Sequence, residues 1–368
     1  MKVPALALAG FLASVPSMQA QAPAAAPPAG LRNAKVTTRA VSPGGLAAEV
    51  SRLSGGAGPL WIGYSQPVVA GKHRMCCFGS FHGKISDADR LCCGGCDLEH
   101  DDSFTIGDDD RRPVQLEGSN GLVVLLRADR GRIGRVRALD DECGIDAGGL
   151  PFVWLTGVAP GESVTFLASM VRKLEAGDHG EDAAEGALTA VAMTGHPAAD
   201  AALERLLARG EPRELRKKAA FWVGNSRGGR GFEILKAHLA DPDPGFRHHL
   251  TFALSQSDVR EAVDVLIGMA KRDPDGRVRG QALFWLAQKA AGRAAQAIQN
   301  AIRDDPDEDV KEKAVFALSQ LPGGEGVTEL IRVARTNRNP EVRKMAVFWL
   351  GQSRDPRALA FIEEVLDR

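Results

Sequence analysis

The second half of the chain repeats itself about every 32 residues, and this period limits the possible folds more than any other feature. Five segments share one pattern: LRKKAAFWVGNS from Leu215, FRHHLTFALSQS from Phe246, VRGQALFWLAQK from Val278, VKEKAVFALSQL from Val310 and VRKMAVFWLGQS from Val342. A weaker copy, AAEGALTAVAMTGH, begins at Ala183. A unit of this length cannot bury an apolar face alone, so the copies are expected to stack into a solenoid.

Each unit contains two segments of helical length. The first segment is preceded, at a fixed offset, by residues that cap helix N-termini: Asp243, Asp275, Asp307 and Asn339. Pro244 and Pro340 follow two of these caps, at a position where the missing N–H costs nothing. A second amphipathic stretch, such as GFEILKAHLAD or RALAFIEEVLD, completes the unit. The pattern predicts two helices per unit.

The stretches DPDPGFRHHLTFAL, DPDGRVRGQALFWL and NPEVRKMAVFWLGQSRDPRAL resemble the short bacterial HEAT-like repeat, an armadillo-like type also found in phycobilin lyases. The resemblance covers residues 183–368 and implies an all-α superhelix of six units. It implies little about function, because such repeats serve many unrelated roles. Some HEAT-like proteins are di-iron hydroxylases that use repeated His-Glu pairs, and this chain contains no His-Glu dipeptide.

A basic residue occupies the second position of each main helix. The column contains Arg216, Arg247, Arg279, Lys311 and Arg343. It has two interpretations: a ligand-binding column, or an Asp/Arg ladder that ties each repeat to its neighbour, as the HEAT family uses. The capping residues Asp243, Asp275 and Asp307 lie four residues ahead of three of the cations, which favours the structural ladder.

An aromatic residue occupies the seventh position of each main helix. At about 100° per residue, this position lies opposite the apolar arc. The column contains Phe221, Phe252, Phe284, Phe316 and Phe348. An amide column follows four residues later: Asn225, Gln256, Gln288, Gln320 and Gln352. Two interpretations remain open: a groove that binds a protein or peptide partner, or rings packed into the next repeat with amides tying down loops. The HEAT resemblance implies that this helix lines the concave side.

The first half of the chain lacks the repeat. Residues 35–176 contain short apolar stretches of strand length: PLWIGYS, GLVVLLRA, RIGRVRAL, PFVWLTGV and SVTFLAS. LLRADRGRIGRV predicts a hairpin that turns at Asp129–Gly131. We therefore expect an α+β protein, with a small, mostly-β, cysteine-rich N-terminal domain, a hinge at 177–182 and six helical repeats at 183–368. The acidic clusters match no calcium-binding loop, and no cofactor is predicted.

Residues 1–20 have the layout of a secretory signal peptide. Lys2 precedes an apolar run that ends near Val15, and cleavage is expected after Ala20. Residues 21–34 form a Pro/Ala-rich linker. The pattern predicts a secreted or periplasmic protein. No other stretch reaches 18 apolar residues, so no membrane span is expected. The 46 Lys and Arg residues balance the 47 Asp and Glu residues, which gives no bias toward nucleic acid.

Six cysteines lie in the N-terminal half: Cys76, Cys77, Cys92, Cys93, Cys96 and Cys143. An even number in an oxidising compartment favours disulfides, and adjacent cysteines rarely bond to each other. A structural metal is the second interpretation, because Cys93 and Cys96 have zinc-knuckle spacing and three histidines lie nearby. Free or redox-active thiols are the third.

The sequence contains no nucleophile elbow, phosphate loop or dinucleotide fingerprint. The leading hypothesis is therefore a secreted or periplasmic scaffold that binds a protein or peptide partner on its solenoid surface, and not an enzyme. The alternative is a metal- or thiol-dependent enzyme, or an enzyme subunit, with its site near the N-terminal cysteine cluster.

Overall fold

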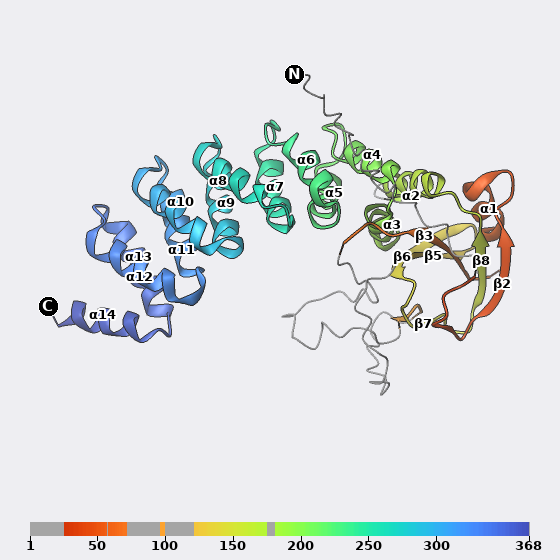
Figure 1. Ribbon diagram of the computed structural model, residues 1–368, viewed down its shortest axis with the longest axis horizontal. Helices are drawn as coiled ribbons and strands as arrows, with labels where there is room; N and C mark the ends of the chain where they lie inside the picture. Colours follow the sequence, from red (N-terminus) through yellow and green to blue (C-terminus); the bar gives the residue numbers. More distant parts are fainter. Residues whose placement is uncertain (1–25, 57, 72–95, 100–120, 175–180, 368) are drawn as a thin grey trace, which may run out of the picture.

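The computed structural model describes residues 26–56, 58–71, 96–99, 121–174 and 181–367. Over these residues the chain forms a region with β-sheets followed by helices arranged in an arc (Figure 1). The expected signal peptide and the cysteines at positions 76, 77, 92 and 93 lie outside the described residues, as does most of the expected hinge.

Within the described residues, the main sheet has five strands in the order β2-β8-β3-β5-β6. The strands are β2 (Lys35–Ala40), β8 (Pro151–Thr156), β3 (Leu60–Pro67), β5 (Gly121–Asp129) and β6 (Arg132–Asp140). β2, β8 and β3 are parallel, whereas β3, β5 and β6 form an antiparallel meander. The predicted hairpin between β5 and β6 is confirmed. Its turn contains Arg130 and Gly131, both with positive φ, as two-residue hairpin turns require.

Four of the five predicted strands are present, and the fifth prediction was wrong. SVTFLAS lies within helix α2 (Pro160–Leu174). Val164, Leu167 and Val171 are spaced three and four residues apart, and all three are buried. A seven-residue window showed the β-branched residues but was too short to reveal this helical period.

Apolar residues cover both faces of the main sheet, because successive strand residues alternate between the faces. Ile62 and Val124 belong to the core shared with helices α1 (Gly45–Ser54), α2 and α3 (Glu181–Met193). Phe152 and Trp154 belong to a second cluster on the opposite face. A small parallel sheet joins this second cluster; its strands are β1 (Leu31–Arg32), β7 (Ile145–Asp146) and β4 (Cys96–Asp97).

Residues 181–367 form six helical pairs after the sheet. They are α3 with α4 (Pro197–Leu206), α5 (Arg213–Ser226) with α6 (Gly228–Lys236), α7 (Pro244–Gln256) with α8 (Glu261–Arg272), α9 (Gly276–Lys289) with α10 (Ala291–Asp304), α11 (Glu308–Ser319) with α12 (Glu325–Thr336), and α13 (Pro340–Gln352) with α14 (Pro356–Leu366). α3 packs directly on β6, where a Cβ at Gly186 would meet the carbonyl oxygen of Val136 at 2.0 Å. One apolar core therefore runs from the sheet into the solenoid.

The predicted helix caps are confirmed. The side chains of Asp243, Asp275, Asp307 and Asn339 each accept a hydrogen bond from the backbone N–H two residues later. Consecutive main helices α5, α7, α9, α11 and α13 pack on one another. Figure 1 shows α5, α7, α9 and α11 along the inner edge of the arc and α6, α8 and α10 along its outer edge. The seventh-position phenylalanines therefore lie on the inner row of helices.

Candidate partner-binding surface

The phenylalanine column forms contacts between the rings of neighbouring repeats. The ring centroids of Phe221 and Phe252 are 5.7 Å apart, with an interplanar angle of 10°. Phe284 and Phe316 repeat this stacking at 5.9 Å and 6°. Each stacked pair thus joins two successive main helices through aromatic contact.

Tryptophans at the eighth position connect the stacked pairs, a role that was not predicted from the sequence. Trp285 lies between Phe252 and Phe284, with centroid distances of 4.9 and 4.8 Å. Trp349 occupies the equivalent place in the last unit, 4.8 and 5.1 Å from its nearest Phe rings. Trp222 contacts the first Phe ring at 5.3 Å. The available signal was the Phe-Trp dipeptide in alternate repeats. We call these eight rings the aromatic ladder: Phe221, Trp222, Phe252, Phe284, Trp285, Phe316, Phe348 and Trp349.

The rings of the aromatic ladder are only partly covered. Four of the five column phenylalanines are half-buried, and Phe348 is 53% exposed. In each earlier unit the aromatic side chain of the next unit packs on the Phe ring, whereas Phe348 lies in the last unit. The ladder therefore combines inter-repeat packing with an accessible rim.

The amide column follows the ladder along the same row of helices. Asn225, Gln256 and Gln320 are half-buried, whereas Gln288 and Gln352 are exposed. The side-chain amides of Gln256 and Gln320 donate hydrogen bonds to neighbouring serine hydroxyls at 3.0 and 2.9 Å. Gln288 donates across the repeat boundary to Gln320 at 3.5 Å. Each amide carries both donors and an acceptor, so the column offers both kinds of hydrogen-bonding group.

His249 borders the aromatic ladder on α7, and His248 precedes it in the same helix. The ring of His249 lies 5.6 Å from Phe252, and its Nε2 is 2.8 Å from the carbonyl oxygen of Lys217. Burial lowers the pKa of His249 and that of His248. Both imidazoles are therefore expected to be neutral near pH 7, which leaves this part of the ladder's border without cationic histidines.

The basic column is structural, but its main acidic partners are not the predicted ones. Arg247 pairs through two nitrogens with Asp273, at 2.8 Å each, and Arg279 pairs with Asp305 in the same way. Arg216 pairs with Asp241. The acids lie two residues before the capping positions, whose carboxylates accept hydrogen bonds from backbone N–H groups of the first helical turn. The sequence signal was the repeated Asp-Pro-Asp, whose first Asp had no assigned role.

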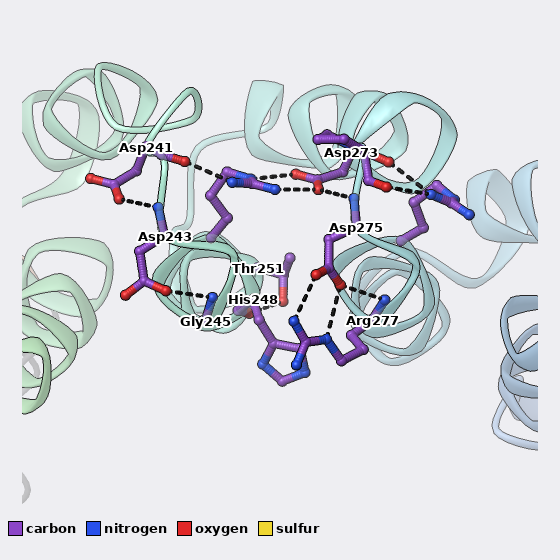
Figure 2. A network of polar contacts seen from close by, with 11 residues as sticks. Asp241, Asp243, Gly245, His248, Thr251, Asp273, Asp275 and Arg277 are labelled. Carbon is purple, nitrogen blue, oxygen red and sulfur yellow. Dashed lines mark hydrogen bonds and ion pairs between the residues drawn. The ribbon is translucent and has the colours of Figure 1, made fainter.

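These pairs form a continuous Arg–Asp ladder between repeats, defined by Arg216–Asp241, Arg247–Asp273 and Arg279–Asp305. Each acid also accepts a hydrogen bond from the backbone N–H two residues later, as Figure 2 shows for Asp241 and Asp273. The backbone carbonyls of these two acids accept from the arginines of their own repeats, at 2.7 and 2.9 Å. The ladder is buried, so each charge depends on its partner.

The Arg–Asp ladder does not extend into the last unit. Lys311 pairs with Glu308 at 2.7 Å instead of with an acid of the next repeat. Asn337 occupies the place of the acid there, and Arg343 donates to its backbone carbonyl at 2.9 Å. The prediction of a repeated tie between neighbours therefore applies to the first three cations of the column only.

The N-terminal region contains a separate polar cluster and a cavity. Glu99 accepts hydrogen bonds from the indole of Trp61 at 2.8 Å and from Arg127 at 2.8–3.1 Å. Burial acts to raise the pKa of Glu99, but these hydrogen bonds outweigh it and lower that pKa.

A cavity of about 660 Å³ lies elsewhere in this region, lined in part by Ser65 and Trp154. Within the described ranges, no cluster of His, Cys, Asp and Glu could hold a metal ion.

The stacked units, with capped main helices and charged residues between repeats, define this part of the protein as a helical-repeat solenoid. The family model for HEAT repeats matches residues 200–287, 232–319 and 295–368. Residues 200–368 are therefore HEAT repeats, as the sequence resemblance predicted. The N-terminal part has no family match.

Solved structures of helical-repeat proteins are similar to this chain at low identity. Human deoxyhypusine hydroxylase in complex with glycerol is 18% identical, over 56% of this chain and 90% of that chain, with a TM-score of 0.29. Kap121p is 14% identical, over 51% of this chain and 25% of its own, with a TM-score of 0.34. A chain of the Pds5–Scc1 complex is 16% identical, over 51% of this chain and 28% of its own, with a TM-score of 0.28. No curated protein matches the chain. No helix in the described part is long and apolar enough to cross a membrane.

Proposed function

We propose that the protein is a secreted or periplasmic scaffold that binds a protein or peptide partner along the inner row of its solenoid. One observation carries the proposal: the aromatic ladder runs across five units, and its column phenylalanines are only partly covered. Rings of this size are costly to leave in contact with water, and contiguous apolar surface often marks an interaction site.

The amide column supplies the polar half of the proposed surface. An extended peptide presents backbone N–H and C=O groups, and a side-chain amide can pair with both. Gln288 and Gln352 are exposed, so their amides are accessible to such a partner. The rings then contribute apolar contact. The amides contribute hydrogen bonds to the partner's backbone, and losing them leaves those backbone groups unsatisfied in the complex.

The amide column allows binding to be tested separately from stability. In the variant Gln256→Ala/Gln288→Ala/Gln320→Ala, the aromatic ladder remains, and each substitution at these accessible sites should change the free energy of unfolding by only about 0.5 kcal/mol. The purified variant and the wild type would serve as bait in the secreted or periplasmic fraction of the source organism. The wild type should capture a partner that the variant does not.

A matched control uses exposed residues on the outer helices. Glu233, Lys271 and Arg303 lie on α6, α8 and α10 and are exposed. Their triple alanine variant should capture the partner as the wild type does. Equal capture by the amide variant would contradict the proposed surface, and loss of capture by the outer-helix control would place the site elsewhere.

The proposed location depends on residues 1–20, which have the pattern of a signal peptide. The even number of cysteines supports the same proposal, because disulfides form and persist in oxidising compartments. Cell fractionation with N-terminal sequencing tests the location. A mature N-terminus near Gln21 in the exported fraction is expected, and an intact Met1 in the cytosolic fraction would contradict it.

A second candidate function, a small-molecule or metal-dependent site in the N-terminal region, is favoured by the cavity. Its lining includes Asp141 and Glu142, next to Cys143 in the sequence, and the indole of Trp154. A volume of about 660 Å³ is in the range of small-molecule sites. Elemental analysis of the purified protein separates the candidates: a stoichiometric transition metal would favour the second.

A further inference from the structure

The last helix presents an apolar surface to solvent. We call this the end surface; it consists of Leu359, Ile362, Val365 and Leu366 on α14. Leu359, Val365 and Leu366 are 60%, 46% and 78% exposed, and Ile362 is half-buried. Large apolar side chains this exposed are few in the described part of the chain, and three of them lie here. Glu363 and Asp367 are exposed beside this apolar stripe.

The equivalent residues in earlier repeats show how such a surface is normally covered. Thirty-two residues earlier, Val327, Leu330 and Val333 of α12 are 8%, 1% and 3% exposed. The matching residues of α8 are also buried: Val263, Leu266, Met269 and Ala270. In each of these units the second helix packs on the next main helix, as α8 does on α9 and α12 does on α13.

The last unit keeps apolar residues at these positions. A repeat that closes a solenoid against water needs a polar outer face. Leu359 and Leu366 instead occupy places where α12 has the smaller Val327 and Ala334. The end surface is therefore suited to contact with another helix, and no helix of the described residues covers it.

We propose that the end surface binds the end surface of a second copy of this chain. The charges around α14 favour this occupant. Arg354 lies just before the helix, and Glu363 and Asp367 lie toward its end. The other two charges of this region are engaged within the chain, because Arg357 pairs with Asp355 and Glu364 pairs with Arg335. Two copies of α14 packed antiparallel about a two-fold axis bring the basic end of each helix beside the acidic end of the other, while the apolar stripes meet.

The contact area limits the strength of this dimer. One helix per partner gives less contact than the roughly 800 Å² per partner of a standard stable interface. A Kd on the order of 10 μM is therefore expected for the purified protein. Analytical ultracentrifugation over about 1–200 μM protein should show a reversible shift from monomer to dimer.

Substitutions on exposed residues test the surface without disturbing the core. Leu359→Glu/Leu366→Glu should give a monomer throughout the concentration range, with unchanged helical circular dichroism. Val36→Glu is the matched control, because Val36 is another exposed apolar residue, 42% accessible, on β2. This control should dimerise as the wild type does. A monomeric wild type, a dimeric Leu359→Glu/Leu366→Glu variant, or a monomeric control would each overturn the proposal.

A charge exchange tests the antiparallel arrangement. Arg354→Glu should weaken the dimer by about threefold to fivefold, because it places a negative charge beside the acidic end of the partner helix. Adding Asp367→Arg should restore the wild-type Kd. A double variant that dimerises no better than Arg354→Glu alone would overturn the antiparallel arrangement.

Discussion

The Arg–Asp ladder gives the sharpest prediction about stability, at Arg247. Its guanidinium makes two 2.8 Å contacts with Asp273 and donates to the backbone carbonyl of Asp241 at 2.7 Å. Arg247→Met removes all three contacts but keeps much of the apolar stem. The carboxylate of Asp273 then remains buried and keeps the hydrogen bond from the backbone N–H of Asp275.

We expect Arg247→Met to lower the free energy of unfolding by about 3–5 kcal/mol, the cost of leaving one member of a buried ion pair without its partner. Replacing both members, in Arg247→Met/Asp273→Leu, should recover most of this loss, because no uncompensated charge stays buried. Urea unfolding followed by circular dichroism measures both variants. A double variant as unstable as the single one would refute the assignment of the loss to the buried carboxylate.

Arg277 supplies a matched control within the same repeats. It pairs with Asp275 at 2.7 Å, but its side chain is 69% exposed, and this pair lies outside the buried ladder. Arg277→Met should therefore leave the free energy of unfolding nearly unchanged, because exposed ion pairs contribute little to stability. Equal losses of stability in Arg247→Met and Arg277→Met would show that burial is not what makes the Arg–Asp ladder strong.

Three further predictions concern the same features. Burial acts to raise the pKa of Asp305, but hydrogen bonds from Arg279 and a backbone N–H lower it overall. A carboxylate whose pKa is lower in the folded state stabilises the fold when the pH is above its unfolded-state pKa of about 4, and this stability is lost as the pH falls further. The free energy of unfolding of Asp305→Asn should therefore decline less steeply below about pH 4 than that of the wild type. An equally steep decline would contradict this prediction. The double variant Lys311→Arg/Asn337→Asp should extend the Arg–Asp ladder by one pair. A double-mutant cycle of urea unfolding should give a favourable coupling of about 1–3 kcal/mol. Zero coupling would show that the new carboxylate and guanidinium do not meet. Thiol labelling and intact-mass analysis of the exported protein should find a start near Gln21 and no reactive cysteines, whereas six labelled cysteines without metal would end the disulfide hypothesis.

The repeat period predicted the solenoid well because, in residues 183–368, the helix caps and apolar positions visible in the sequence are also the ones that form the stacked helices. Asp243 and its equivalents cap helices through contacts two residues away, so the sequence alone could locate them. The partner of Arg247 lies 26 residues away on the next repeat, and only the stacking geometry distinguishes Asp273 from the capping Asp275. The strand prediction at residues 163–169 failed for a related reason: the helical period of α2 was visible only in a longer window.

The main helix of each repeat has two roles, stabilising the repeat stack and forming the proposed partner surface. These roles can be tested separately because they fall on different faces of the helix. At about 100° per residue, the second and seventh positions lie about 140° apart around the helix. Arg247, at the second position, is buried against the next repeat, whereas Phe252, at the seventh, keeps an accessible edge. Substitutions at the second position should therefore act mainly through the stability of the repeat stack. Substitutions in the amide column, which follows the seventh position by one helical turn, should act mainly through the proposed partner surface.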